Sequence, residues 1–231
     1  QVRTKAVAGI AFAGESAQQY SKKAISDLNF GDKVEDKSWT WEHKTRDDYT
    51  GSGTVKPVTW IVVAKNHYGE DSGVTLLSQE LIGRYMFDNS TNVHPYNGSN
   101  HWGNSNHIRP WLNSSFYNTF SEEFKNAVLT TNVPNKTYEN ADYVTKDNVF
   151  IPSTTELGDE DYTITYKIGE VYPFFAGAAN ERRIAKLGSN NSTYWTRSPR
   201  SRLEDLLICI LANGSQGEKM RSENSCAIYN N

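Results

Sequence analysis

The sequence predicts an α+β domain built from small antiparallel sheets, and two observations indicate this class. Stretches with strand character are numerous and short, whereas few stretches resemble helices. Long segments rich in Asn, Gly and Ser join them, and these residues favour turns because they compete for backbone hydrogen bonds or tolerate left-handed dihedral angles. Many short strands, few helices and long ordered loops are typical of an α+β fold with antiparallel pairing.

Size and charge restrict the classes of function. The chain has 231 residues and a formal net charge of −3. This length fits one domain with an appendage. The charge balance argues against a polyanion binder, such as a nucleic-acid-binding protein, that works through bulk electrostatics. The longest apolar runs, at residues 60–64 and 206–212, are far shorter than the ~20 residues that cross a bilayer, so we expect no membrane insertion. The first residues also lack the apolar core of a signal peptide.

In the first half of the chain, local patterns define three elements. Residues 1–30 are expected to form an N-terminal extension with a short helix, because Ser16 and Gln19 have the spacing of a capping box. Residues 58–63 and 73–78 predict the two strands of a β-hairpin. Residues 81–86 are expected to be helical.

The second half predicts one helix and several strands. Ser121 followed by two glutamates indicates a helix that ends near Leu129. Strands are expected at residues 149–153, 194–199, 206–212 and 225–229. A core of large apolar side chains is expected at Trp60, Leu76, Trp111, Leu112, Phe116, Phe150 and Trp195.

Two cysteines leave a question of pairing. If residues 206–230 form a hairpin that turns near Gly217, Cys209 and Cys226 lie opposite each other. Cross-strand disulfides need unusual geometry, so two free, half-buried thiols on neighbouring strands are the favoured interpretation.

Motifs for catalysis and metal binding are largely missing. There is no Gly-x-Ser-x-Gly, phosphate-binding glycine loop, His-Glu-x-x-His or Cys-x-x-Cys. The spacing of His94, His101 and His107 matches no ligand pattern. The acidic run 159–161 is interpreted as a solvated loop in preference to a calcium site. We therefore expect no cofactor, no metal and no enzyme activity.

Two arginines lie in motifs that favour a structural role, namely Arg109 and Arg197. An arginine always carries charge, so a buried one needs partners within the fold. Arg197 either contacts a ligand or anchors the scaffold through loop carbonyls or a carboxylate, with Asp147 or Glu156 as the candidates. The scaffold hypothesis is favoured because residues 194–199 alternate as a strand does and Pro199 marks its end.

Five motifs resemble, in the same order, those of a C-type-lectin-fold family that includes the variable proteins of diversity-generating retroelements in phages, bacteria and archaeal viruses. The formylglycine-generating enzyme fold is a more distant relation. The motifs are Trp60-Ile61-Val62, Thr75-Leu76-Leu77-Ser78, Arg109-x-Trp111-Leu112-Asn113, Asp147-x-Val149-Phe150-Ile151-Pro152-Ser153 and Tyr194-Trp195-Thr196-Arg197-Ser198-Pro199. The resemblance implies a C-type-lectin-like domain over residues 31–231, with two main helices and long ordered loops.

The resemblance also implies a function, namely recognition of a protein or glycan receptor on a target cell, from the surface of a virion or cell. The C-terminal segment 200–224 would carry the diversified ligand-binding residues. They are Arg200, Arg202, Leu203, Glu204, Asp205, Leu207, Asn213, Gln216, Glu218, Lys219, Met220, Arg221, Glu223 and Asn224. The alternatives are an enzyme of the formylglycine-generating type and a structural cell-surface or carbohydrate-binding module. The Glu-Pro-Asn motif of calcium-dependent lectins and the closely spaced cysteine pair of the oxygenase are both missing, which disfavours those two activities.

Overall fold

The structure is a computed structural model of the chain. It describes residues 2–4, 11–13, 27–43, 53–69, 73–88, 98–221 and 225–228; at residues 2–4, 11–13, 218–221 and 225–228 the description is confined to the backbone. The described part is a mixed α/β structure with mostly small antiparallel sheets and few helices, as the sequence predicts. The helix expected over residues 16–28 lies largely outside the described residues.

The first sheet has five strands, all antiparallel. Their order is β1 (Val2–Thr4), β7 (Val74–Ser78), β6 (Thr59–Lys65), β3 (Lys33–Glu35) and β2 (Ala11–Ala13). The predicted hairpin is confirmed as β6 and β7, with Val62 opposite Leu76. Both strands are mostly buried, which agrees with their nearly continuous apolar sequence.

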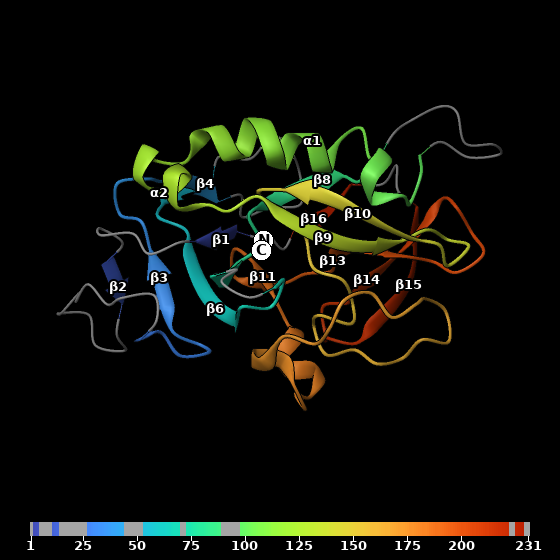
Figure 1. The fold of residues 1–231 in the computed structure, drawn as a ribbon. Coiled ribbons are helices and arrows are strands. Elements are labelled where there is room, and N and C mark those ends of the chain that lie inside the picture. Colours follow the sequence, from blue (N-terminus) through green and yellow to red (C-terminus); the bar gives the residue numbers. More distant parts are fainter. Residues whose placement is uncertain are drawn as a thin grey trace.

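The second sheet carries the C-terminal strands. Its order is β15 (Gln216–Arg221), β14 (Leu206–Ile210), β13 (Tyr194–Pro199), β16 (Ser225–Ile228) and β8 (Gly83–Met86). The β13 and β16 strands run parallel, and the other neighbours are antiparallel. The two sheets lie on opposite sides of the view in Figure 1, with the main helices above them.

Two expectations are wrong in this sheet. Residues 83–86 form a strand because they pair with β16. This partner strand is distant in the sequence, and its backbone supplies the hydrogen bonds. The hairpin that contains Cys209 closes between β14 and β15, so that Cys209 lies opposite Gly217. Strand β13 separates β14 from β16, which carries Cys226. Cys209 is a free, fully buried thiol.

Three two-stranded sheets complete the strands, and each is antiparallel. They pair β4 (Trp41–His43) with β5 (Thr54–Lys56), β9 (Thr131–Lys136) with β10 (Asp142–Asp147), and β11 (Lys186–Leu187) with β12 (Asn190–Asn191).

The longest helical stretch runs through three consecutive elements. They are α1 (Ile108–Trp111), the π-helical turn η3 (Leu112–Phe116) and η4 (Tyr117–Thr119). Helix α2 (Glu122–Ala127) follows, and the Ser121 hydroxyl accepts a hydrogen bond from the Phe124 amide at 3.1 Å, as the predicted N-cap requires. The remaining helical turns are η2 (Trp102–Asn104), η5 (Pro173–Phe175) and η6 (Asn180–Arg183).

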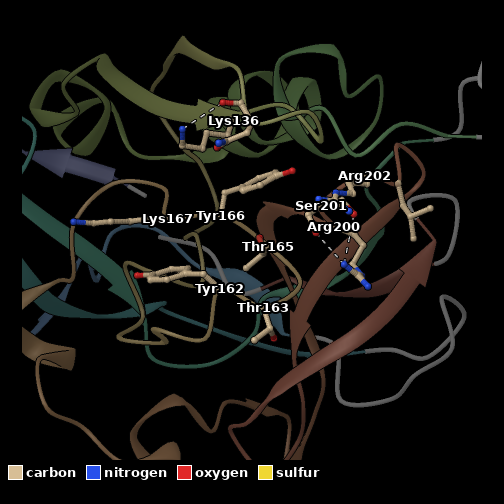
Figure 2. A pocket seen from close by; sticks show the side chains of 11 residues that line it. Lys136, Tyr162, Thr163, Thr165, Tyr166, Lys167, Arg200, Ser201 and Arg202 are labelled. Atoms are coloured by element: carbon tan, nitrogen blue, oxygen red, sulfur yellow. Dashed lines mark hydrogen bonds between the residues drawn. The ribbon is translucent and has the colours of Figure 1, made fainter.

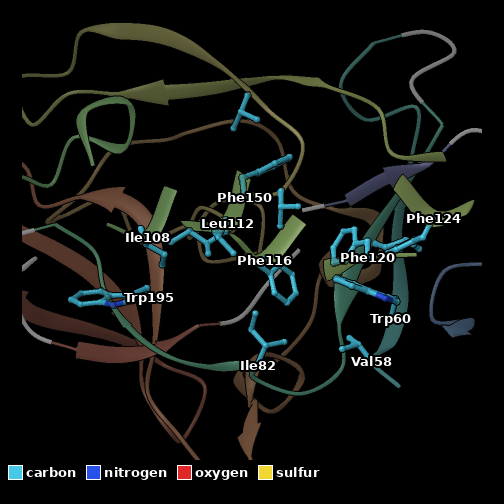
Figure 3. Packing of buried hydrophobic residues seen from close by; sticks show 14 of the residues in the cluster. Val58, Trp60, Ile82, Ile108, Leu112, Phe116, Phe120, Phe124, Phe150 and Trp195 are labelled. Atoms are coloured by element: carbon cyan, nitrogen blue, oxygen red, sulfur yellow. The ribbon is translucent and has the colours of Figure 1, made fainter. Parts of the chain in front are cut away.

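One apolar cluster joins the sheets and helices (Figure 3). It contains a residue from each of the five motifs: Trp60, Leu76, Leu112, Phe150 and Trp195. Phe116 is buried as well, whereas Trp111 is only half-buried, because its ring packs on Tyr85 and Trp41 at the edge of the cluster. Residues 149–153 are buried but form no strand.

Candidate functional site

An open cleft of about 900 Å³ lies where three separate segments meet (Figure 2). The β9–β10 hairpin contributes Lys136 and Asn140. The loop at 162–167 forms a second wall, and residues 200–203, which follow β13, form the third. This volume is within the ~300–1,000 Å³ range of ligand pockets. The cleft therefore places the beginning of the predicted binding segment at a candidate binding site.

Main-chain hydrogen bonds hold the third wall in position. The Ser201 amide donates to the Ile164 carbonyl at 2.9 Å, and the Arg202 amide donates to the Tyr138 carbonyl at 2.9 Å. The side-chain amide of Asn100 donates to the carbonyls of Leu203 at 2.6 Å and Leu206 at 2.8 Å. The backbone of this loop is thus held by residues outside it.

Side-chain hydrogen bonds also link the three walls of the cleft to one another. The Thr165 hydroxyl donates to the Pro199 carbonyl at 2.8 Å, and the Tyr166 hydroxyl donates to the Tyr138 carbonyl at 2.9 Å. Arg200 reaches across with its guanidinium group to the Ile164 carbonyl at 3.1 Å. Such cross-links make a preformed cleft, which reduces the entropy lost on binding.

The lining is basic and rich in hydroxyl groups. Its cations are Lys136, Lys167, Arg200 and Arg202, and no acidic side chain is among the lining residues that the structure describes. Tyr162, Thr163, Thr165, Tyr166 and Ser201 bring hydroxyl groups, Asn140 brings an amide, and Leu203 is the aliphatic residue. Figure 2 shows Lys136, Lys167 and the arginines on different sides of Tyr166.

Arg200 and Arg202 form no ion pair within the described part of the chain. Arg202 is exposed and its backbone is left-handed, with φ of 64°. The other two non-glycine residues with positive φ, Asn66 and Asn140, are asparagines, which tolerate this region. An arginine there costs roughly 1–2 kcal/mol.

A buried ion pair supports the strand that leads into the cleft. Arg197 on β13 is 1% exposed. It donates from both terminal nitrogens to the Glu156 carboxylate at 2.5 Å, and to the carbonyls of Ile151 at 2.9 Å and Pro134 at 3.3 Å. Its guanidinium also lies 5.6 Å from the Phe150 ring centre. This confirms the scaffold hypothesis for Arg197, with Glu156 as its partner.

Two tyrosines extend this buried pair. The Tyr68 hydroxyl donates to Glu156 at 2.8 Å and lies 2.6 Å from the Tyr172 hydroxyl. Burial alone would raise the pKa of the Glu156 carboxyl, but the charge and hydrogen bonds of Arg197 outweigh it and hold this pKa below its ordinary value. Burial, reinforced by the negative charge of Glu156, raises the pKa of both tyrosines. The carboxylate therefore stays charged and the phenols stay neutral.

A second buried carboxylate organises the other arginine motif. Asp147 accepts hydrogen bonds from Arg109 at 2.7 Å, Trp102 at 3.0 Å and Thr145 at 2.6 Å. Asn113 bonds to the backbone of residues 148 and 149, which ties the π-helical turn to this segment. Both arginine motifs thus have structural roles.

The predicted binding residues do not form one surface. Arg200, Arg202 and Leu203 line the cleft. Asp205 and Leu207 are buried, at 9% and 0% exposure, so neither belongs to an exposed binding face. Leu207 turns inward because β14 is a central strand, buried along most of its length. Glu204 is half-buried, and its negative charge adds to that of Glu139 in raising the pKa of Tyr138.

Two further residues of the predicted segment, Asn213 and Gln216, are not among the cleft-lining residues that the structure describes. Asn213 is exposed at the β14–β15 turn, and Gln216 is half-buried at the start of β15. Glu218, Lys219, Met220 and Arg221 belong to β15, described by its backbone. Glu223 and Asn224 lie outside the described residues. The lining residues that the sequence interpretation missed come from 136–140 and 162–167, and the alternation of Tyr and Thr at 162–166 was their signal.

Metal-ligating side chains do not gather in the described part: it contains no cluster of three or more His, Cys, Asp and Glu side chains suited to an ion. In the acidic run 159–161, Asp159 is buried and lies 3.6 Å from Arg183, which corrects the expectation of a fully solvated loop. No helix among the described residues is long and apolar enough to span a membrane.

The geometry defines a mixed α/β protein with a preformed basic cleft. Residues 72–228 match the model of a family described as a domain of unknown function, DUF6273. Because this match covers more than half of the chain, the chain belongs to that family. No curated protein and no solved structure matches the chain.

Proposed function

We propose that this protein is a non-enzymatic recognition domain with a C-type-lectin-like fold, which binds its ligand with side chains displayed by the loop at residues 200–206. The observation that carries the proposal is how this loop is held. Its backbone is hydrogen-bonded to Asn100, Tyr138 and Ile164, none of which belongs to the loop. The side chains of Arg202 and Leu203 are exposed. Substitutions at these positions leave the anchoring bonds intact.

Support for the C-type-lectin-like fold comes from the packing of the five motifs. Each motif places at least one residue in the same apolar cluster. The two arginine motifs connect to the segment at 147–156 through Asp147 and Glu156. Motifs that resemble one family along the chain therefore form a single structural unit, as a conserved scaffold below a variable surface requires.

The tolerance of the loop can be measured by randomising single positions. We expect most substitutions at 202 and 203 to change the free energy of unfolding by less than about 0.5 kcal/mol, which is usual at exposed sites. Leu207 is the matched control in the same segment, because it is fully buried and its replacement by Ala costs about 2–5 kcal/mol. Protease resistance of a displayed library of variants measures how substitutions at 202, 203 and 207 change the stability of the fold. Loss of folding for most variants at 202 and 203 would contradict the proposal.

Natural variation tests the link to diversity-generating retroelements. We expect sequencing of this gene across a growing population to find substitutions concentrated at adenine-rich codons after Pro199. The codons of the buried residues Leu207 to Ile210 are the internal control and should stay constant. If the sequence is uniform throughout and no reverse transcriptase gene lies nearby, the protein is not diversified by a retroelement. This result would favour a structural module or an enzyme.

A further inference from the structure

We infer that the cleft binds an acidic saccharide, that is, a sugar chain that bears carboxylate or sulfate groups. This inference rests on the proposed function and names its ligand class. It is drawn from the residues that line the cleft, which combine cations with hydroxyl and amide groups.

The cations indicate an anionic ligand. Four basic side chains converge on one cleft of a protein with a net charge of −3, so the positive charge is local. Lys136 pairs with Asp142 and Lys167 pairs with Glu170, but these carboxylates are 84% and 74% exposed. The Lys167 pair is exposed on both sides and therefore weak, so Lys167 remains available to a ligand. Lys136 is 19% exposed and adds its positive charge to the cleft wall.

The arginines are the stronger part of the argument. Arg200 uses its Nη1 for neutral oxygens of Ile164 and Ser201, and its Nε is buried without a hydrogen-bond partner among the described residues. Arg202 is exposed, and its side chain has no polar partner in the described part of the chain. Guanidinium groups bind carboxylate and sulfate-like oxyanions with paired, charge-assisted hydrogen bonds.

Arg202 also occupies a position that disfavours it. At φ of 64°, Gly or Asn is less strained than Arg. Strained residues that persist in a structure occur most often at binding and active sites. We attribute the presence of an arginine at this position to ligand binding, because its side chain stabilises nothing else that the structure describes.

The neutral lining residues favour a saccharide over an acidic peptide. Five lining side chains carry hydroxyl groups and Asn140 carries an amide, whereas Leu203 is the one aliphatic side chain of the lining. Arginine clusters also recognise acidic peptides, but the other modes of peptide recognition add a strand edge or apolar pockets for side chains, and the described lining is mostly hydroxyl, amide and cationic groups. Here the walls are two loops and the end of a hairpin. The hydroxyls of Thr163, Thr165 and Tyr166 donate to protein oxygens and offer their lone pairs as acceptors to sugar hydroxyls. The cations and the Asn140 amide supply donors, and the Tyr162 and Tyr166 rings offer apolar faces to sugar rings.

Binding of four defined probes by calorimetry tests the ligand class. They are a heparin-derived hexasaccharide, a hexamer of galacturonate, neutral cellohexaose and a hexaglutamate peptide. We expect at least one acidic saccharide to bind ten times more tightly than the neutral saccharide and the peptide. The first two probes distinguish sulfate from carboxylate as the recognised group. Affinity should fall as the salt concentration rises, because the cleft is open to solvent and its charges are screened.

Variants at one position isolate the charge of Arg202. Arg202→Asn removes the charge and suits the left-handed backbone, so we expect an unchanged or higher melting temperature and at least a tenfold weaker affinity. Arg202→Lys keeps the charge and should lose less affinity than Arg202→Asn. Lys186→Gln is the control, because Lys186 is exposed on β11 and does not line the cleft; its affinity should equal that of the unmodified protein.

Several outcomes would overturn the inference. Equal binding of cellohexaose would show that charge is not recognised, and equal binding of hexaglutamate would make the ligand an acidic peptide. An Arg202→Asn variant that binds the acidic saccharide as well as the parent does would place the site elsewhere. If none of the probes binds although positions 202 and 203 tolerate substitution, the ligand class is wrong and the proposed function still stands.

Discussion

Replacing Arg197 by lysine tests the scaffold below the cleft most directly. The substitution keeps the positive charge next to Glu156 but removes the planar fork of the guanidinium. In the structure this fork reaches both oxygens of Glu156 and the carbonyls of Ile151 and Pro134. A lysine ammonium is a compact group on a flexible stem and cannot reproduce these four bonds from one position.

The size of the effect follows from the bonds that are lost. If the lysine retains two of the four, the loss of two bonds to a charged group costs at least about 3 kcal/mol, at the lower end of ~1.5–3 kcal/mol each. For a chain of this length, one kcal/mol lowers the melting temperature by roughly 2–4 °C. We therefore expect Arg197→Lys to melt at least about 6 °C below the parent without any ligand present.

Thermal unfolding followed by circular dichroism measures the difference, with Arg182→Lys as the control. Arg182 makes contacts of the same kind, to the Phe174 carbonyl at 2.7 Å and over the Phe174 ring at 5.3 Å, but it is exposed. The control should melt within about 2 °C of the parent, because exposed substitutions stay within ~0.5 kcal/mol. An Arg197→Lys variant that melts like the parent would refute the reasoning. If it also failed to bind the ligand, Arg197 would belong to the recognition site.

Four further predictions concern the same scaffold. Trp195→Ala should destabilise the protein by ~3–5 kcal/mol in urea unfolding, as is typical of a fully buried large aromatic residue; a smaller loss would mean that the site collapses around the missing ring. Asn100→Ala removes the side-chain donor to the Leu203 carbonyl and one of two donors to the Leu206 carbonyl, which also accepts from the Arg200 amide, so urea unfolding should show a loss of about 1–3 kcal/mol and hydrogen exchange at 201 and 202 should accelerate. Burial raises the pKa of the Cys209 thiol to about 11, so iodoacetamide at pH 8 should modify it only after unfolding, as peptide mass spectrometry would show; rapid labelling of the native protein would contradict its burial. Because the pKa of Glu156 in the folded state lies below its ordinary value of 4.5, its pairing stabilises the fold above that pH and the contribution is lost as the pH falls further; the melting temperature should drop in acid by less in Glu156→Gln than in the parent.

The parts of the fold that were predicted correctly depend on residues close together in the chain. The β6–β7 hairpin follows from two apolar runs on either side of a turn, and the start of α2 follows from Ser121 and the glutamates after it. The strand expected at 194–199 is confirmed as β13, but all of its 6 residues are buried, so the burial of Arg197 does not result from alternation. Short-range patterns determine such elements because turn geometry and capping bonds involve neighbouring residues.

The wrong predictions concern residues whose conformation is decided by distant partners. Residues 83–86 have a sequence compatible with a helix, yet they form β8 because β16 pairs with them. Residues 149–153 are apolar enough for a strand, but the Val149 and Ile151 carbonyls accept from the side chains of Asn113 and Arg197. A main-chain bond from the Arg197 amide to the Pro152 carbonyl links the segment to β13 without making a ladder. Local propensity is weak compared with tertiary hydrogen bonding and burial.

The sequence by itself determined the fold class, the principal core residues and the structural role of the two arginine motifs. It also indicated that residues 200–203 could face a ligand. Only the tertiary structure decided what surrounds them, since Lys136 and Tyr162 to Lys167 come from segments far away in the chain. A cleft is formed by segments that come together only when the chain folds. Their positions along the sequence therefore do not predict which of them will line it.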